Sequence, residues 1–332
     1  MKSPNLSVLA ALVLLTYGAC SACSTVAQPA PHLQYFGYAG GGSETALVQT
    51  ADYTNIVYFG TSSEDAGLPA TMDRLAAHNQ KAMLNIAPVF WTYKEAPIPG
   101  SDVWAYSQVQ YPDWKARWDT WIAANPTVFT PSRVLSVTPF DEPMNAGLNM
   151  KEYEAVCAYI KATLPWVKVM HVDGLSSAAK GNVATYIHDG GKLPNVDIIA
   201  IDAYCIHPTD NAEYLSFVSL YKDSFPGKQW FYILDGFWDA NHVKAFGPDI
   251  NVMATVAEEY YQVAESDPDA IGIGTFIWEG GDTSNWIQSS AFPTFVLIEH
   301  KSVGDRIISR PAVHHLIHQQ GVFAPAPHSG RN

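Results

Sequence analysis

The sequence predicts a single-domain (β/α)8 barrel, the TIM-barrel class of α/β fold. Three observations support this prediction. Eight short, β-favouring apolar runs recur along the chain, stretches of helical periodicity separate several of them, and no second domain is indicated. The runs start about 25 to 40 residues apart, which is the size of one βα unit. Eight such units in one domain of this length indicate a barrel.

The predicted strands are near-continuous apolar runs, as expected when parallel strands are buried on both faces. They lie within residues 32–40, 55–62, 81–91, 133–143, 167–174, 196–208, 229–239 and 270–281. Helical patterns between them cover residues 71–79, 150–164, 211–225 and 250–266. Cys157 lies in the second of these helical patterns, where we expect it to be a core residue.

The interval between the third and fourth runs is longer than the others. Within it, Trp114, Trp118 and Trp121 follow helical spacing. Large apolar side chains that repeat on one helix face are typical of a face packed against the core. We therefore expect a packing stripe here rather than a platform for sugar rings.

An open, doubly wound sheet is the alternative fold. It would lead us to expect a glycine fingerprint after the first strand. Residues 37–44, "GYAGGGSE", contain glycines but lack the G-x-G-x-x-G spacing, and the sequence has no P-loop motif. The barrel is therefore preferred.

The N-terminus has the layout of a secretory signal peptide over residues 1–27. One lysine leads into an apolar run of about ten residues and then into small residues, and the run is too short to span a bilayer. Because "YGAC" is similar to a bacterial lipobox, a lipid anchor on Cys20 or Cys23 is the alternative. The barrel is expected over residues 28–301 and a C-terminal extension over residues 302–332.

Composition narrows the class of partner. The formal net charge is −13, which suits a secreted or periplasmic protein and argues against nucleic acid or an anionic membrane surface. There are four cysteines, and two of them lie in the predicted signal region, so the chain is not a disulfide scaffold. No cofactor and no metal ion are expected.

The active site of a barrel lies at the C-terminal ends of its strands. The polar and aromatic residues expected there are Tyr38, Trp91, Asp141, Glu142, His171, Asp173, Asp202, Tyr204, His207, Asp235, Trp238, Trp278 and Glu279. They predict an acidic cup with aromatic walls and little positive charge. Phosphorylated substrates need cationic partners, so a neutral oligosaccharide or polysaccharide fits better.

The segment "TPFDEPMN" at residues 138–145 resembles the strand-four Asn-Glu-Pro motif of clan A glycoside hydrolases, with Asp141 in place of the asparagine. This resemblance implies a retaining glycosidase with Glu142 as acid/base. "ILDGFW" resembles the nucleophile segment of that clan, with Asp235 in place of glutamate, and a structural carboxylate that caps a loop is the alternative for Asp235. "FIWEGG" resembles its strand-eight tryptophan segment, at Trp278.

The adjacent Asp-Glu pair also resembles that of the retaining β-hexosaminidases. This second resemblance implies that Asp141 orients the 2-acetamido group of the substrate as the nucleophile while Glu142 remains the acid/base. Tyr204 would help to hold the acetamido group. A non-catalytic carbohydrate-binding barrel is the alternative from a different functional class.

Pro143 is expected to let the adjacent acids Asp141 and Glu142 lie in one site. Adjacent strand residues point to opposite faces, so the strand must end here. Pro143 ends it and is expected to hold Glu142 in an extended conformation over the barrel mouth. His171 and Asp173 share one strand face and are expected to bind substrate or to hold a network, with a metal ion as a further alternative. Glu279 is expected to bind or orient substrate, and His314 and His318, at helical spacing, lack a third metal ligand.

Overall fold

The structure is a computed structural model that describes residues 32–61, 67–97, 104–279 and 286–308. Eight parallel strands form a closed barrel in the order β1-β11-β9-β8-β7-β6-β3-β2. This confirms the predicted (β/α)8 fold, and each predicted run contains one barrel strand. The strands are β1 Tyr35–Ala39, β2 Ile56–Gly60, β3 Lys81–Asn85, β6 Val134–Thr138, β7 Lys168–Gly174, β8 Ile198–Asp202, β9 Gln229–Asp235 and β11 Ala270–Phe276.

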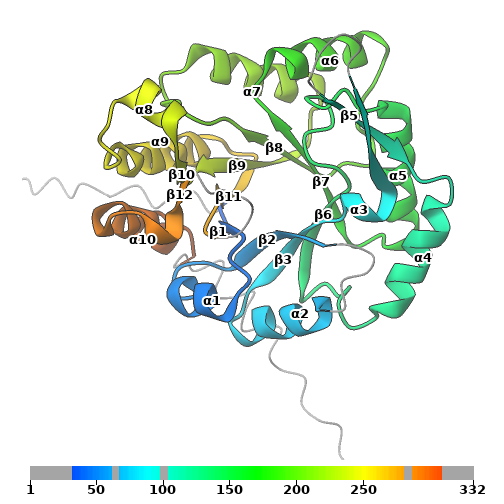
Figure 1. Cartoon of the computed structure of the whole chain (residues 1–332), viewed down its shortest axis with the longest axis horizontal. Helices are drawn as coiled ribbons and strands as arrows, with labels where there is room; N and C mark the ends of the chain where they lie inside the picture. The colour runs from blue at the N-terminus through cyan, green and yellow to red at the C-terminus, as the bar shows by residue number, and fades with distance from the viewer. Residues whose placement is uncertain (1–31, 62–66, 98–103, 280–285, 309–332) are drawn as a thin grey trace, which may run out of the picture.

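Helices cover the outside of the barrel (Figure 1). The described helices are α1 Glu44–Thr50, α2 Leu68–Ala77, α3 Ala87–Phe90, α4 Trp114–Ala124, α5 Met150–Thr163, α6 Ser177–His188, α7 Ala212–Ser224, α8 Ala240–Phe246, α9 Val252–Ser266 and α10 Thr294–Ile308. Side-chain caps begin several of them, for example at Asn149, Ser176 and Asn211. Cys157 is 1% exposed in α5, which confirms it as a core residue.

Two apolar cores follow from the alternation of side chains along the strands. A small cluster fills the inside of the barrel and includes Met83, Met170, Val172 and Phe231. A much larger cluster lies between the outer faces of the strands and the helices. Adjacent polar residues on one strand therefore lie in different environments. One points towards the barrel axis, and the next lies under the helices.

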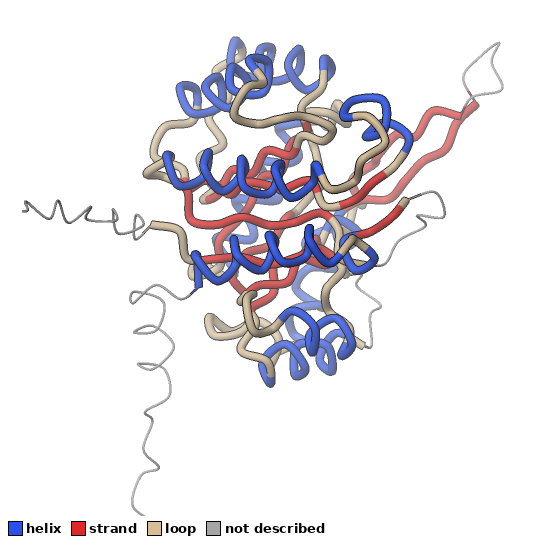
Figure 2. The backbone as a smooth tube through the Cα atoms, turned by 90° about the vertical axis from the view of Figure 1, so that its left-hand side faces the viewer, coloured by secondary structure: helices blue, strands red, loops and turns tan. Residues whose placement is uncertain are grey.

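The long interval after β3 forms a hairpin and a helix. Strands β4 Trp91–Pro97 and β5 Trp104–Gln110 pair antiparallel, and Figure 2 shows this hairpin extending away from the barrel. The helix α4 follows, with Trp118 fully buried and Trp121 3% exposed. Both pack with Phe129, so the predicted packing stripe is confirmed.

The chain closes the barrel through β10 Phe237–Trp238, β12 Ile287–Gln288, the short 3-10 helix Ser289–Ala291 and α10. Because α10 packs on β1 and α9 and ends at Ile308, the barrel fold continues past the expected boundary at residue 301. The predicted signal peptide, Cys20, Cys23, His314 and His318 lie outside the described residues. Among the described helices, none is both long and apolar enough to cross a membrane.

Candidate functional site

A cleft of about 280 Å³ opens at the C-terminal ends of the barrel strands. Three carboxyl groups line it, those of Asp141, Glu142 and Asp202. The other lining residues are aromatic, apolar or small: Ala39, Tyr58, Met83, Met170, Val172, Tyr204, Phe231, Ile233, Gly274, Thr275, Phe276 and Trp286. None of these described lining residues is a lysine or an arginine, so the cleft is acidic with aromatic walls.

The backbone after β6 brings two adjacent acids into the cleft. Asp141 forms an isolated parallel bridge with Val172 of β7, and Glu142 then adopts a φ of 51°. A left-handed residue breaks the alternation of the strand, so both side chains can line the same cleft. The expectation of an extended Glu142 before Pro143 is therefore wrong.

The left-handed turn is held by hydrogen bonds that follow it. Asp173 accepts hydrogen bonds from the backbone N–H groups of Met144 and Asn145, at 3.3 and 3.0 Å. The N–H of Ala146 donates to the carbonyl of Glu142 at 2.9 Å. These bonds offset the cost of about 1–3 kcal/mol that a sparsely populated backbone conformation carries.

The carboxylate of Glu142 is fixed on two sides. Asn145 Nδ2 donates to Glu142 Oε2 at 2.7 Å, and Ser176 Oγ, the cap of α6, donates to Asn145 Oδ1 at 2.6 Å. On the other side the carboxylate lies over Gly174, where an added Cβ would overlap Glu142 Oε1. The same Cβ would lie 3.1 Å from Asp202 Oδ1, so Gly174 is the space in which these two carboxyls meet.

Crowding and burial raise the pKa values of two of these carboxyl groups, Asp202 and Asp141. Burial raises the pKa of Asp202 well above its ordinary value, and the charges of Glu142 and Asp141 and a hydrogen bond with Glu142 raise it further. Asp141 is open to solvent at the cleft mouth, but the surrounding protein atoms desolvate its carboxyl group. This desolvation, with the charges of Glu142 and Asp173, raises the pKa of Asp141 to about 7.

Tyr204 joins the acids to the aromatic wall. Its hydroxyl donates to Asp202 Oδ2 at 2.9 Å, and its ring centroid lies 5.1 Å from that of Phe237 and 5.7 Å from that of Phe276. Trp286 stacks on Phe237 at 4.4 Å and is 37% exposed. An exposed indole at the edge of an acidic cleft can stack on the apolar face of a sugar ring.

His171 and Asp173 do not line the cleft, which corrects the expectation that they bind substrate. Both are fully buried on the helix side of β7. His171 contacts Tyr153 and Asp173, and Tyr221 donates to Asp173 at 2.8 Å. The physical reason is the alternation of side chains along a strand. Met170 and Val172 face the barrel axis, so His171 and Asp173, the residues that follow them, face outward.

Asp235 also lies outside the cleft lining, although it ends β9. It is fully buried, and both its oxygens contact His242 Nε2, at 3.0 and 2.9 Å. The N–H of Cys205 donates to it at 2.8 Å. Burial raises the pKa of Asp235, and its hydrogen bonds oppose that shift. The expected nucleophile is thus a fully hydrogen-bonded buried carboxyl, which corrects the expectation that it faces Glu142 across the cleft.

The remaining predicted site residues lie beside the cleft or away from it. Tyr38 is 2% exposed and packs against Trp278 and His300 under α10. Glu279 accepts a hydrogen bond from Ser43, His207 pairs with Glu259, and Trp238 packs on His242. Trp91 lines a neighbouring cavity of about 350 Å³ that shares Asp141 with the cleft. The expectation that all of them line one cup is therefore corrected.

Several residues at the cleft are not indicated by the sequence motifs. Tyr58 points into the barrel from β2. The alternation in "NIVYFGTS" would indicate this position once it is known which residues of the strand face the barrel axis. Phe276 ends β11, and Asn145, which holds the Glu142 carboxylate, lies two residues after the Asp-Glu-Pro motif. Trp286 lies beyond the last predicted strand, and no pattern in the sequence points to it.

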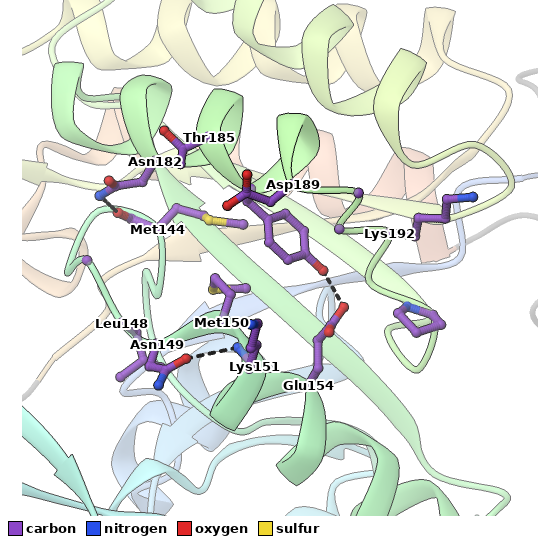
Figure 3. Close-up of a pocket in the computed structure, with 15 residues that line it drawn as sticks. Met144, Leu148, Asn149, Met150, Lys151, Glu154, Asn182, Thr185, Asp189 and Lys192 are labelled. Carbon is purple, nitrogen blue, oxygen red and sulfur yellow. Dashed lines mark hydrogen bonds between the residues drawn. The ribbon is translucent and has the colours of Figure 1, made fainter.

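A larger cavity, of about 740 Å³, lies on the outer side of the barrel between α5 and α6 (Figure 3). It contains side chains of both charges, including Lys151, Glu154 and Asp189. Asn182 Nδ2 donates to the carbonyl of Met144 at 2.7 Å, which connects this cavity to the back of the turn that carries Glu142. None of the predicted site residues lines it, so size alone does not identify the active site.

Comparison with solved structures gives the same fold. A GH113 β-1,4-mannanase matches with a TM-score of 0.51 at 10% identity, over 82% of this chain and 98% of the mannanase. A Penicillium canescens endo-1,4-β-xylanase matches with a TM-score of 0.53 at 11% identity, over 85% and 96% of the two chains. A thermostable mutant of a Cellvibrio japonicus xylanase matches with a TM-score of 0.52 at 11% identity, over 82% and 97%.

The chain has the barrel fold of these enzymes. At 10 to 11% identity the likeness extends to the fold and not to individual residues. No protein-family model matches the sequence, and no curated protein matches it. The chemistry must therefore be inferred from the cleft itself.

Proposed function

We propose that the protein is a glycoside hydrolase that cleaves a neutral or N-acetylated sugar, with Glu142 as the acid/base. The observation that carries this proposal is the group of three carboxyls, Asp141, Glu142 and Asp202, in one aromatic-walled cleft at the C-terminal face of a barrel. Similar folds in a mannanase and in xylanases agree with it. Neutral polyols are the class of substrate that such a cleft suits.

The chemistry needs one proton donor and one anion near the anomeric carbon. The pKa of Asp202 is raised well above its ordinary value, so Asp202 holds a proton beside Glu142, and Asp141 titrates near neutral pH. In the proposed reaction a proton passes from Asp202 to Glu142, and Glu142 delivers it to the glycosidic oxygen as the bond to the anomeric carbon breaks. In the second step the oxygen of the incoming water bonds to that carbon and displaces the nucleophile of the first step. Glu142 takes the proton of this water and returns it to Asp202. Asp202 and Asn145 hold the Glu142 carboxyl in place for both steps.

The second carboxylate is assigned to Asp141. Asp235 is enclosed by His242 and Cys205, whereas Asp141 lies in the cleft with Tyr204. This arrangement favours the substrate-assisted interpretation, in which Asp141 orients a 2-acetamido group whose oxygen attacks the anomeric carbon. A thiazoline that mimics the cyclised intermediate should then inhibit tightly. A 2-fluoro glycoside that labels Asp235 would instead support a covalent glycosyl-enzyme.

Glu142→Gln tests the proposal. Because the amide cannot donate an acid proton, we expect turnover of aryl glycosides with poor leaving groups to fall about 10²- to 10⁴-fold. Binding of an oligosaccharide, measured by calorimetry, should remain. Glu213→Gln, at an exposed glutamate in the first turn of α7, is the matched control and should leave turnover unchanged. If the unmodified protein binds sugars and cleaves none, it is a carbohydrate-binding barrel instead.

A polysaccharide substrate agrees with a protein that leaves the cytoplasm. We therefore infer that residues 1–27 are a cleaved signal peptide and that the mature protein is secreted or periplasmic. A lipid anchor on Cys20 or Cys23 is the alternative. Mass spectrometry of the N-terminus of the mature protein distinguishes a chain that begins at Gln28 from one that begins at a lipid-modified cysteine.

A further inference from the structure

Three side chains of metal-ligating type converge behind the cleft. They are Cys205 in the segment after β8, Asp235 at the end of β9 and His242 in α8. One potential ligand atom from each lies within 4.8 Å of the others. Asp235 and His242 are fully buried, and Cys205 is partly exposed. Figure 1 shows α8, β9 and β10 as neighbouring elements on this side of the barrel.

The imidazole of His242 is oriented as a metal ligand requires. Its Nδ1 lies 2.6 Å from Asp239 Oδ1, and its Nε2 faces Asp235. The ring is fixed by Phe237 at 4.6 Å and by Trp238 at 5.5 Å between ring centroids. A carboxylate on the far nitrogen of a histidine is the usual support of a metal-bound imidazole, because it fixes the ring and makes the near nitrogen a better ligand.

The spacing is close to that of a tetrahedral zinc site. Zinc bonds of about 2.0–2.3 Å to nitrogen, oxygen and sulfur place the ligand atoms roughly 3.3–3.8 Å apart. His242 Nε2 and Asp235 Oδ2 are 2.9 Å apart. Small movements, of about 1 Å or less on this geometry, would admit the ion. Mixed sulfur, nitrogen and oxygen donors suit zinc rather than magnesium or calcium.

We propose that Cys205, Asp235 and His242 bind a zinc ion, with Asp239 as the outer support of His242. The fourth position is a water molecule on the exposed side of Cys205. Thiolate, carboxylate and neutral imidazole bring two negative charges to the ion, which balance its charge of +2. A buried cation also gives Asp235, at the end of β9, a role that needs no contact with substrate.

The site connects three segments that support the wall of the cleft. Cys205 directly follows Tyr204, and Phe237 lies between Tyr204 and His242, with ring centroids 5.1 and 4.6 Å away. A bound ion would hold the segment after β8 against β9 and α8. It would thereby fix Tyr204 without entering the cleft. The proposal is independent of the reaction that the cleft performs.

Cobalt binding tests the site directly, because a tetrahedral cobalt ion has visible d–d bands and a thiolate ligand adds an ultraviolet charge-transfer band. The parent for the test is the full chain with Cys20→Ser and Cys23→Ser, which removes the two cysteines outside the described residues. We expect both bands to saturate at one cobalt per chain and zinc to displace them.

Matched variants of this parent locate the ligands. Cys205→Ser should abolish the charge-transfer band, whereas Cys157→Ala, at the other cysteine of the described residues, should retain it. Asp239→Asn keeps the cap of α8 but weakens the support of His242, so cobalt should bind about 10- to 100-fold more weakly. Circular dichroism confirms that each variant is folded. A folded parent without the charge-transfer band, or a band that survives Cys205→Ser, overturns the proposal.

Discussion

Glu142 combines a reactive side chain with an unfavourable backbone. Its φ of 51° is tolerated because the turn that follows is hydrogen-bonded to Asp173. Such strain is often found where a side chain must be presented in one orientation. Here the left-handed residue turns the carboxylate from the strand direction towards Gly174, where it meets the carboxyl of Asp202.

Comparing Glu142→Gly with Glu142→Ala measures this strain. Both variants remove the carboxylate, so turnover should be lost in both. Only glycine adopts a positive φ without steric cost, so the glycine variant should be more stable than the alanine variant by about 1 kcal/mol. Urea unfolding gives the two free energies. An alanine variant that is the more stable of the two would show that the backbone is not strained.

At the scale of elements, the end of β7 positions the turn that carries Glu142. One face of this strand contributes Asp173, which anchors the turn from the helix side. The other face contributes Gly174, which leaves room for the Glu142 carboxylate. The adjacent residues Asp173 and Gly174 can anchor the turn and leave room for the carboxylate because neighbouring strand positions point to opposite sides.

Gly174→Ala should therefore impair catalysis without unfolding the barrel. The new Cβ would overlap Glu142 Oε1 and approach Glu142 Cδ to 3.0 Å, so the carboxylate must move. A displacement of about 1 Å can cost roughly 10²-fold in rate, and we expect a loss of that order in kcat. Steady-state kinetics on an aryl glycoside measures it.

Gly181→Ala, in α6, is the matched control for Gly174→Ala. Nothing lies within 4 Å of a Cβ at this exposed position. Alanine should stabilise the helix by about 1 kcal/mol and leave kcat unchanged. If both alanine variants retain full activity, Gly174 does not determine the position of Glu142.

At the scale of the whole molecule, the cluster of acids makes stability depend on pH. The pKa of Asp141 is about 7 in the folded protein, above its ordinary value of 3.8. Between these values the folded state binds a proton that the unfolded state has lost, so the free energy of unfolding falls as pH rises through this interval. The raised pKa of Asp202 acts in the same direction.

Asp141→Asn should reduce this dependence. The amide carries no charge, so the variant should gain stability relative to the parent as pH rises from about 4 to about 7. Thermal melts of both proteins across this interval measure the difference. If the difference in melting temperature is constant with pH, Asp141 does not carry a raised pKa.

The sequence by itself determined the barrel and the place of its chemistry. Eight apolar runs at βα spacing predict a parallel sheet covered by helices, because each run buries both faces, and eight units in one domain favour a closed barrel. The Asp-Glu-Pro motif placed Asp141 and Glu142 at the end of a strand, and both line the cleft. Local pattern was sufficient in these cases because burial and strand ends are properties of single segments.

The tertiary structure alone decided which residues share the cleft. His171 and Asp173 end up under the helices because the inward parity of β7 is set by its pairing with neighbouring strands. Asp235 is withdrawn from the cleft by His242, a residue on the following helix that no strand pattern identifies. Trp286 reaches the cleft from a distant part of the chain. The pairing register of the strands, and the meeting of distant residues in one cleft, depend on closure of the whole sheet. No single segment of the sequence contains that information.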